Sequence, residues 1–476
     1  MSLTAAEWKQ RLLGADCAVL GFGVSNRPLV PFLQKMGAKV TVRDEAPFEK
    51  LGEEAVRYRE MGVRFLTGEG YLDHLDEELL FRSPGMRPDL PAFEEAKRRG
   101  AILSSEMELF LDLTPALVLG VTGSDGKTTT TTVTGLLLDA ECKKTGKGRV
   151  FVGGNIGTPL CQRALDMTCE DVAILELSSF QLQTVTRSPH RAALTNLSPN
   201  HLNWHTDMGE YANAKANIFL HEPNGLLVLN AENEESIALA SDYPHRIFWF
   251  SSAKHTPDAF APLMRAGDAA VFVRSGEITV WDRGREDVML PASEILLPGK
   301  HNLENYMTAI ALTYGLVSKE TLLTVARSFS GVAHRLELVR RHDGVTYYNS
   351  SIDSTPSRTA AALSALSQKP IVICGGYDKK VPFEPLAKAL WERASAVVLT
   401  GATAEKIGDA IKREQPSVDA RLPVYFEADF RRAVLRAKEI AQKGDAVLLS
   451  PACASFDVFR NFEERGNLFC EIVRSF

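Results

Sequence analysis

The chain has 476 residues, about three times the usual domain size of roughly 100–200 residues, so two to four domains are expected. Its 45% hydrophobic and 24% charged residues are typical of globular proteins and exclude collagen-like, heptad-dominated and wholly disordered chains. A net charge of −6 gives no general basic field for nucleic acid or an anionic membrane, so any phosphorylated ligand would need local binding groups.

The N-terminal segment contains acidic residues and has no apolar core of signal-peptide length. No apolar run approaches the roughly 18 residues that span a bilayer. Seven scattered cysteines, an odd number without a Cys-x-x-Cys pair, favour a reducing compartment. We therefore expect a cytoplasmic protein without membrane insertion.

The first hundred residues open as a βαβ unit. The pattern predicts a strand at 17–23, a helix at 26–36 and a second strand at 39–44. A turn follows at Arg82-Ser83-Pro84-Gly85, and Pro115 marks the start of a new unit.

The turn after the first strand, Gly21-Phe22-Gly23-Val24-Ser25, is glycine-rich, but Asn26 replaces the third glycine of a dinucleotide fingerprint. Asp44 ends the second strand, about where such folds place a ribose-binding acid. The turn is either a nucleotide site or a structural βα connection.

The middle of the chain begins again with a strand into a glycine turn, at 115–123. An alternating region at 270–282 suggests a small antiparallel insert, and a helix is expected to begin near His301. Further strands are expected at 172–177, 192–197 and 225–230.

From Gly331 onward the strands recur regularly, with starts 23 to 27 residues apart, the spacing of βαβ units. They are expected at 345–349, 370–376, 396–401, 423–426 and 446–451. The fold class is therefore α/β with parallel sheets, whose ligands bind at the carboxyl ends of the strands.

The sharpest local motif is Gly123-Ser124-Asp125-Gly126-Lys127-Thr128-Thr129, between an apolar strand and a helix-compatible run. Its glycines let backbone N–H groups face a polyphosphate, Lys127 neutralises phosphate charge, and a threonine hydroxyl can join Mg²⁺. Val121 stands where the full phosphate-loop pattern has its first glycine. The motif predicts an ATP site, with a plain glycine turn as the alternative.

Three later residues each have a functional and a structural interpretation. Glu176 ends a strand and could reach a phosphate-bound Mg²⁺, or simply cap a helix. His201 follows another strand and could be a ligand or structural. Lys215, inside a helical run, would ordinarily be a solvated lysine.

Two cations and a serine lie in the last third of the chain. Arg335 could bind a phosphoryl group, and Lys379 directly follows a strand and a glycine pair, but either could equally be a surface cation. Ser455 follows a strand end, close to a helix that carries an arginine.

Nine segments, in this order, resemble the Mur ligase family, and the resemblance extends over residues 21–469. They are TGSDGKTTT, VGGNIGTPL, LELSSFQL, NLSPNHLNWH, NAKANIF, LPGKHNLEN, AHRLE, GGYDK and SPACASFDVFRNFEERGNLF. The last is the most specific, and it resembles the branch that adds D-glutamate to UDP-N-acetylmuramoyl-L-alanine. The shortened phosphate loop is also the family's own form.

The resemblance implies a Rossmann-like UDP-substrate domain at 1–112, a P-loop-type ATP-binding domain at 113–330 and a Rossmann-like amino-acid domain at 331–476. It further implies an ATP-dependent amide ligase of peptidoglycan precursor synthesis that works through an acyl phosphate and releases ADP and phosphate. Such an enzyme positions its reactants and neutralises charge. We expect a monomer that does not bind nucleic acid.

The resemblance also implies roles for individual residues. Metal ligands for two Mg²⁺ ions would be Thr128, Glu176, His201 and a carbamylated Lys215, with Lys127 completing the catalytic set. ATP contacts would come from the phosphate loop, Asn302, Asn305 and Arg335. The UDP-substrate would be held by Gly21, Ser25, Asp44, Ser83 and Asn155, and D-glutamate by Lys379, Ser455 and Phe462.

One segment departs from the family. Where many members have Asn-Asp-Ser-Lys-Ala-Thr-Asn, this chain has Asn349-Ser350-Ser351-Ile352-Asp353-Ser354-Thr355, so contacts from this loop to ATP or the acyl phosphate are in question. The alternatives are another Mur ligase, a folylpolyglutamate synthase, or a catalytically silent nucleotide-binding subunit.

Overall fold

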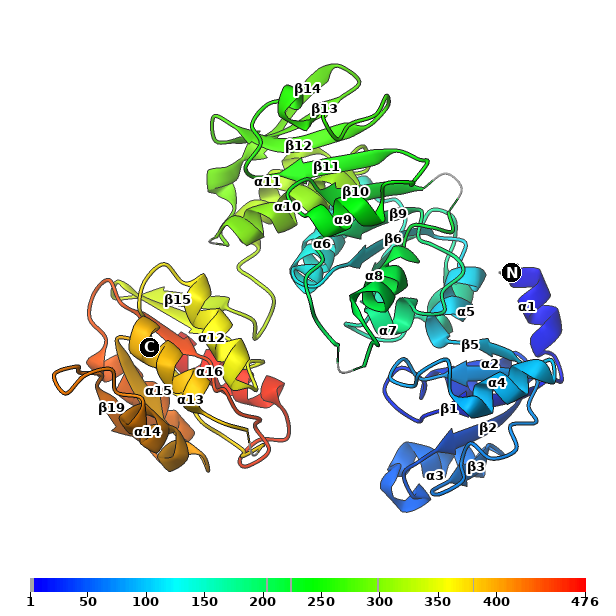
Figure 1. The fold of residues 1–476 in the computed structure, drawn as a ribbon, viewed down its shortest axis with the longest axis horizontal. Helices are drawn as coiled ribbons and strands as arrows, with labels where there is room; N and C mark the ends of the chain where they lie inside the picture. The colour runs from blue at the N-terminus through cyan, green and yellow to red at the C-terminus, as the bar shows by residue number, and fades with distance from the viewer. Residues whose placement is uncertain (1–3, 203, 223–224, 298, 380) are drawn as a thin grey trace. The chain divides into compact units, whose positions relative to one another are not determined.

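The structure is a computed structural model that describes residues 4–202, 204–222, 225–297, 299–379 and 381–476. The chain forms two compact units, the first from Met1–Ile295 with Lys300–Arg327 and the second from Leu296–Gly299 with Ser328–Phe476. Two sheets belong to the first unit and one to the second (Figure 1). The predicted α/β class with three sheet-containing parts is confirmed, whereas boundaries at residues 112 and 330 remain predictions.

The first sheet has five parallel strands in the order β3-β2-β1-β4-β5. The predicted βαβ opening is confirmed, because β1 pairs in parallel with β2 across α2. The elements of this part are α1 (Ala5–Leu12), β1 (Asp16–Leu20), α2 (Leu29–Lys35), β2 (Lys39–Asp44), α3 (Glu53–Glu60), β3 (Arg64–Thr67), β4 (Leu79–Arg82), α4 (Pro91–Arg98), β5 (Ile102–Ser104) and α5 (Glu106–Leu113).

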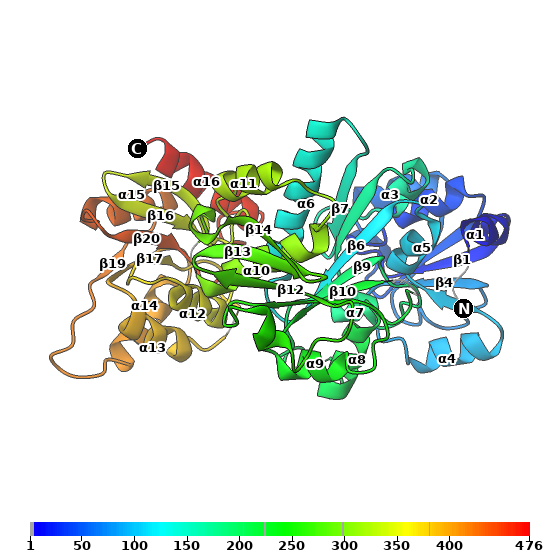
Figure 2. The ribbon, with the colours of Figure 1, turned by 90° about the horizontal axis from the view of Figure 1, so that it is seen from above.

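The central sheet has nine strands in the order β14-β13-β12-β11-β10-β9-β6-β8-β7. The strands expected at 270–282 continue this sheet, since β12 pairs in parallel with β11 and antiparallel with β13. Helices α6 and α10 pack against each other and against this sheet (Figure 2). The elements are β6 (Leu117–Thr122), α6 (Lys127–Thr145), β7 (Val150–Gly154), β8 (Val172–Glu176), α7 (Ser179–Leu182), β9 (Arg191–Leu194), α8 (Met208–Ala216), β10 (Leu226–Asn230), α9 (Glu234–Leu239), β11 (Ile247–Ser251), β12 (Ala269–Arg274), β13 (Glu277–Asp282), β14 (Arg285–Pro291), α10 (Lys300–Thr313) and α11 (Lys319–Ser328).

The sheet of the second unit has the order β15-β16-β20-β17-β18-β19. Its five regularly spaced strands are parallel, as predicted, while β15 adds an antiparallel edge that the sequence did not reveal. The elements are β15 (Glu337–His342), β16 (Val345–Asn349), α12 (Pro356–Ala365), β17 (Ile371–Cys374), α13 (Glu384–Arg393), β18 (Ala396–Leu399), α14 (Ala404–Arg413), β19 (Val424–Phe426), α15 (Phe430–Ile440), β20 (Ala446–Leu449) and α16 (Phe462–Arg474).

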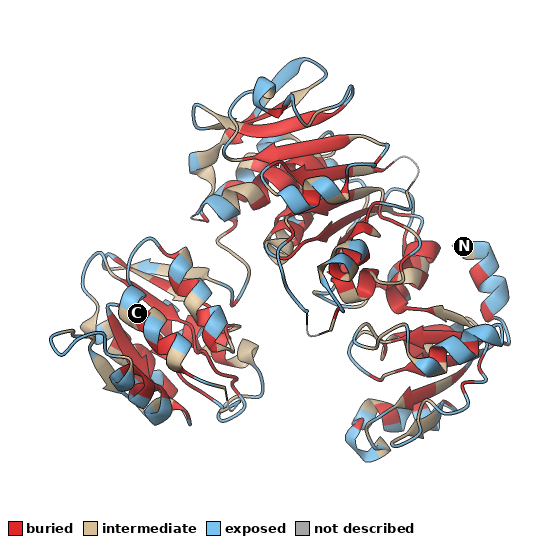
Figure 3. Cartoon of the chain, in the orientation of Figure 1, coloured by how far each residue is buried: buried red, intermediate tan, exposed pale blue. Residues whose placement is uncertain are grey.

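The strands form the buried core of each sheet (Figure 3). In the first unit one hydrophobic cluster runs from Trp8 and Leu33, through Leu109 of α5, to Leu175 of β8. Apolar burial of this kind is the main stabilising contribution in a folded chain. The five-stranded and nine-stranded sheets are therefore held together by a shared core. Among the described helices, none has both the length and the apolar character to cross a bilayer.

Candidate active site

Three strands of the central sheet, β6, β7 and β8, bring predicted site residues to one edge. Parallel pairing places Val121 of β6 opposite Glu176 of β8, and Glu176 opposite Gly154 of β7. Because the carboxyl ends of parallel strands meet at the same edge, the residues that follow these strands lie together. This edge therefore gathers the phosphate loop, Glu176 and Asn155.

The phosphate loop enters α6 through a left-handed residue, Gly126, with φ of 79°. A Cβ at this position would lie 2.4 Å from Asn305 Oδ1, so only glycine fits beside α10. Thr130 donates a 3.2 Å hydrogen bond to the same Asn305 oxygen, and Asp125 N donates a 2.9 Å bond to Asn196 Oδ1. The loop is thus held from both α10 and the segment after β9.

The first turn of α6 carries the polar groups of the motif. Lys127 folds back over the loop, and its Nζ donates 3.0 Å hydrogen bonds to the carbonyl oxygens of Gly123 and Ser124. Thr128 and Thr129 are partly exposed on the same turn. A helix N-terminus bearing a lysine and hydroxyls suits a polyphosphate, as the sequence predicted.

Lys215 of α8 lies in the interior and is only 2% exposed. Its Nζ donates hydrogen bonds to Gly123 O at 2.8 Å and Thr122 Oγ1 at 3.2 Å. Burial, and then the charge of Lys127, lowers the pKa of Lys215 well below its ordinary value of 10.5, against the opposing influence of Glu176 and Asp125. The solvated-lysine interpretation is therefore wrong, and burial shifts this amine towards its neutral form.

Glu176 is also buried, which excludes the exposed helix-capping interpretation. Its Oε1 accepts a 2.8 Å hydrogen bond from Asn155 Nδ2, whereas its Oε2 has no hydrogen-bond partner among the described residues. A buried carboxylate oxygen is costly unless it is hydrogen-bonded or coordinates a metal. This oxygen fits a Mg²⁺ ligand.

A magnesium ion at this edge would be held by mixed oxygen donors. Within the described ranges of the chain, no group of three or more His, Cys, Asp or Glu side chains is arranged to hold a metal ion. Magnesium favours a few protein carboxylates or hydroxyls together with substrate phosphates and water. The donors at this edge fit such a substrate-completed site.

His201 lies in an exposed loop with a left-handed φ of 56°. Its ring packs edge-on against Phe180, with the ring centroids 5.0 Å apart. Partial burial, followed by the charges of Lys127 and Lys215, lowers the pKa of His201. The His201 ring also lies 6.4 Å from the ring of Tyr211, whose hydroxyl is 3.0 Å from Ser124 Oγ of the phosphate loop. The lowered pKa favours the neutral, ligand-competent form of the imidazole.

A cavity of about 310 Å³ in the first unit brings together three of the residues predicted for the UDP-substrate. Gly21 lies beside it, since a Cβ at Gly21 would approach Ser83 Cβ to 3.0 Å. Asp44 does not line this cavity; its carboxylate instead accepts hydrogen bonds from Phe22 N at 2.6 Å and Ala46 N at 2.8 Å. The lining residues are Val24, Ser25, Ser83, Pro84, Gly85, Gly154, Asn155, Gly157, Pro159, Ser178, Phe180 and Gln181.

In the second unit, the predicted cations are exposed and the predicted serine is not. Arg335 and Lys379 are exposed, and Lys379 Nζ donates a 3.3 Å hydrogen bond to Ser354 Oγ. Ser455 is 2% exposed, and its carbonyl accepts from Phe459 N at 2.8 Å. Lys379 can therefore reach a ligand directly, whereas Ser455 has a buried side chain.

The divergent 349–355 loop is packed into the interior of the second unit. Ser350 and Asp353 are buried, and Asp353 Oδ2 accepts a 2.8 Å hydrogen bond from Ser450 Oγ. Burial raises the pKa of Asp353, while hydrogen bonds from Ser350 and Ser450 oppose this. Asp353 therefore serves the packing of the loop.

Two domain families match this chain. Residues 121–313 match the family described as Mur ligase middle domain, and residues 334–453 match the family described as Mur ligase, glutamate ligase domain. A UDP-N-acetylmuramoylalanine–D-glutamate ligase of Clostridium novyi (strain NT) is 46% identical over 477 residues, covering 100% of each chain. The chain belongs to the Mur ligase family.

Other relatives of this Mur ligase carry the same name. The protein of Clostridium perfringens is 45% identical, with 98% of each chain covered, and that of Acetivibrio thermocellus is 42% identical, covering 100% of this chain and 99% of its own. The fold is shared with MurC of Thermotoga maritima (TM-score 0.53, 19% identity, 97% and 99% covered) and MurF of Acinetobacter baumannii (TM-score 0.54, 15% identity, 98% and 93% covered).

Sequence reasoning missed three residues that shape the sites of this Mur ligase. Asn196 holds the phosphate loop, and its position just after β9 was the available signal. Tyr211 OH lies 3.0 Å from Ser124 Oγ. Arg465 is buried, and its guanidinium donates hydrogen bonds to Ser351 and to the carbonyl oxygens of Cys453 and Ala454. The sequence places this arginine on a helix but does not show what the helix packs against.

Proposed function

We propose that this Mur ligase joins D-glutamate to UDP-N-acetylmuramoyl-L-alanine, with ATP converted to ADP and phosphate, in peptidoglycan precursor synthesis. The observation that carries the proposal is full-length similarity to relatives named for this reaction, at 46% identity with complete coverage of both chains. The buried lysine and carboxylate beside a phosphate loop support it independently.

The chemistry runs in two displacements. An oxygen of the L-alanine carboxylate attacks the γ-phosphorus of ATP, the bond to ADP breaks, and an acyl phosphate forms. The amine of D-glutamate then attacks the acyl carbon, phosphate leaves with that carboxylate oxygen, and the amine loses a proton to give the amide. Lys127 and the α6 N-terminus stabilise the negative charge that passes between phosphates.

ATP would be bound by the phosphate loop, Gly123 to Thr129, together with Asn302, Asn305 and Arg335. Thr128 and Glu176 would hold one Mg²⁺, and His201 and a carbamylated Lys215 a second. Magnesium supplies charge neutralisation of the phosphates.

The carbamate would form when the neutral Nζ of Lys215 attacks the carbon of CO₂. A C–N bond forms and a proton is released, which converts the neutral amine into an anionic oxygen donor for a hard metal ion. The lowered pKa of Lys215 supports this step, because only the unprotonated amine is a nucleophile.

The UDP-substrate would be held by Gly21, Ser25, Ser83 and Asn155, with Asp44 shaping the turn. For D-glutamate we propose Lys379, Ser455 and Phe462, of which Lys379 would pair with a carboxylate. We propose one domain for each ligand, at 1–112, 113–330 and 331–476, in a monomeric, cytoplasmic enzyme.

The test is phosphate release by purified protein with each substrate omitted in turn. Release that requires ATP, the UDP-substrate and D-glutamate together supports the proposal. Equal release without D-glutamate contradicts it, and the absence of turnover with all three would favour a silent nucleotide-binding subunit.

A further inference from the structure

Two arginines connect the loop after β4, which carries Ser83, to the segment that carries His201. Arg82 is fully buried, and its guanidinium donates to Met86 O at 2.8 Å and to Phe180 O at 3.0 Å. Phe180 in turn packs its ring against His201. Neither arginine was singled out in the sequence, because an arginine near a turn ordinarily lies on the surface.

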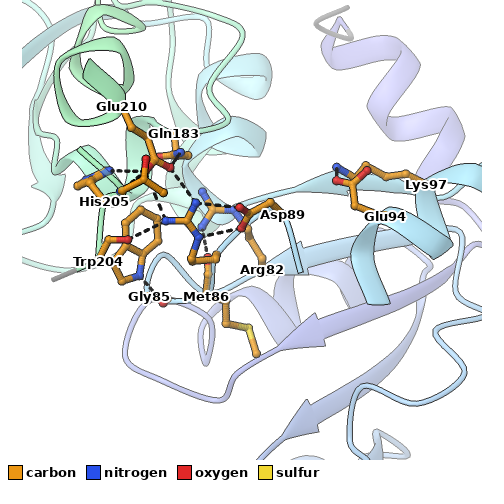
Figure 4. Close-up of polar contacts among 12 residues, drawn as sticks. Arg82, Gly85, Met86, Asp89, Glu94, Lys97, Gln183, Trp204, His205 and Glu210 are labelled. Atoms are coloured by element: carbon orange, nitrogen blue, oxygen red, sulfur yellow. Dashed lines mark hydrogen bonds and ion pairs between the residues drawn. The ribbon is translucent and has the colours of Figure 1, made fainter. Parts of the chain in front are cut away.

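Arg87 makes the second connection. Its guanidinium donates a 2.7 Å hydrogen bond to Trp204 O and a 2.9 Å bond to Glu210 Oε1, and a bidentate pair of 2.8 Å bonds to Asp89. Figure 4 labels these three partners, Trp204, Glu210 and Asp89. The guanidinium carbon also lies 5.1 Å from the Trp204 ring centroid. The planar fork of arginine suits several directed bonds at once, which lysine cannot reproduce.

Trp204 links this guanidinium to both predicted sites. Its backbone N–H donates a 3.0 Å hydrogen bond to His201 O, and its indole Nε1 donates a 3.0 Å bond to Gly85 O. Gly85 lines the same cavity as Ser83, on the side of the predicted UDP-substrate. A displacement of Trp204 would therefore move the backbone of His201 and release the Ser83 loop.

Arg87, Trp204 and Glu210 together form a connection that we call the joint. Glu210 lies on α8 and binds the Arg87 guanidinium. Besides Arg87, its carboxylate accepts hydrogen bonds from Thr206 N at 2.5 Å and Gln183 Nε2 at 2.8 Å. The Arg87 and Glu210 side chains are only 26% and 18% exposed, so this ion pair is less screened than a surface pair. The same helix also carries Lys215 near its C-terminal end.

We propose that Arg87 is a positioning residue that couples the Ser83 loop to the His201 segment, so that UDP-sugar binding orders the metal side of the site. The inference rests on the proposed function for its ligands. Coupling between two sites is reciprocal, so saturation with Mg²⁺ should strengthen UDP-sugar binding in the wild type and not in a variant without the joint.

The test compares Arg87→Gln with Arg87→Lys, which keeps the positive charge. The control is Arg57→Gln, which removes an exposed arginine of α3 whose ion pair to Glu54 is 3.5 Å long. We expect Arg87→Gln to raise the half-saturating Mg²⁺ concentration by about tenfold, because loss of a residue that orients metal ligands has an effect of this size. The KM for UDP-N-acetylmuramoyl-L-alanine should rise by about the same factor. The KM for D-glutamate should not change. Arg87→Lys should be intermediate and Arg57→Gln should resemble the wild type. A fall in kcat alone would indicate a merely structural role and overturn the proposal.

Hydrogen exchange provides a readout that does not depend on turnover. In the unliganded protein, Arg87→Gln should speed amide exchange in both 83–89 and 204–211, and the UDP-sugar should protect 204–211 in the wild type only. Unchanged exchange in 204–211 would overturn the inference even if the wild type is an active ligase. An inactive wild type with faster exchange in the variant would instead refute the proposed function and leave the joint supported.

Discussion

Lys215 Nζ donates a 2.8 Å hydrogen bond to the carbonyl oxygen of Gly123, the first residue of the phosphate loop. A buried amine from a helix some ninety residues away thus contacts the backbone that is expected to surround the ATP phosphates. This contact, together with Glu176 at the end of β8, defines the centre of the proposed site.

Replacing Lys215 with alanine should remove almost all ligase activity. The reason is that the proposed carbamate oxygen would be lost, and short carboxylates such as formate or acetate should restore part of the activity by filling its place. Lys143→Ala, which removes an exposed lysine of α6 paired with Asp139, should keep wild-type activity. Unchanged activity of Lys215→Ala would contradict the proposed carbamate and would show that Lys215 has a structural role only.

Gly126→Ala should weaken ATP binding more than it weakens folding. Both Gly126 and Gly146 have left-handed φ, at the two ends of α6, so an alanine at either site should cost about 1 kcal/mol of unfolding free energy. Only at Gly126 would the new methyl group also meet Asn305, whereas Gly146 has nothing within 4 Å. Urea unfolding and the KM for ATP separate the two effects, and equal KM values for the two variants would contradict the assignment of the loop.

Arg465→Leu should destabilise the second unit and impair D-glutamate binding. The substitution removes the arginine donor of the carbonyl oxygens of Ser351 and Cys453, and it leaves Ala454 O with only the N–H of Tyr377. Each unsatisfied buried group costs roughly 1–3 kcal/mol. Arg460→Leu, which removes an exposed partner of Glu464, should change stability by less than about 1 kcal/mol. Similar unfolding midpoints for the two variants would show that the buried arginine is dispensable.

Glu106 of α5 should make stability depend on pH. Burial raises the pKa of Glu106 to about 7, against hydrogen bonds from the backbone of Cys161 and Leu160. A raised pKa means that the stabilising contribution is complete below about pH 4.5 and is lost as the pH rises through about 7. Relative to the wild type, Glu106→Gln should therefore gain up to roughly 3 kcal/mol between pH 5 and pH 8.5. Parallel stability curves for the two proteins would contradict this.

Local patterns were sufficient for much of the fold. The apolar strands of the second unit and the strand that precedes the phosphate loop lie where the sequence predicted, because buried parallel strands are continuous apolar runs. By contrast, β15 (ELVRRH) is a largely polar strand at the edge of its sheet, and β7 (VFVGG) ends in glycines, so neither has a strong strand signal.

Burial of polar side chains was beyond prediction from the residues alone. Lys215 and Arg82 are enclosed by segments distant in sequence, since Lys215 Nζ donates to Gly123 O and the Arg82 guanidinium donates to Phe180 O. The resemblance to the Mur ligase family pointed to Lys215, but it gave no sign of Arg82 or Arg87. Whether such a polar side chain is buried depends on long-range contacts, which the topology of the fold determines.

The most direct measurement follows oxygen from the UDP-substrate into phosphate. With ¹⁸O in both oxygens of the L-alanine carboxylate, turnover in the presence of ATP, Mg²⁺ and D-glutamate should place one ¹⁸O atom in each released phosphate and leave one in the new amide. This result requires a phosphorylated carboxylate and a D-glutamate amide in the same reaction. Phosphate without ¹⁸O, or labelled phosphate and amide formed equally well without D-glutamate, would contradict the proposed ligase.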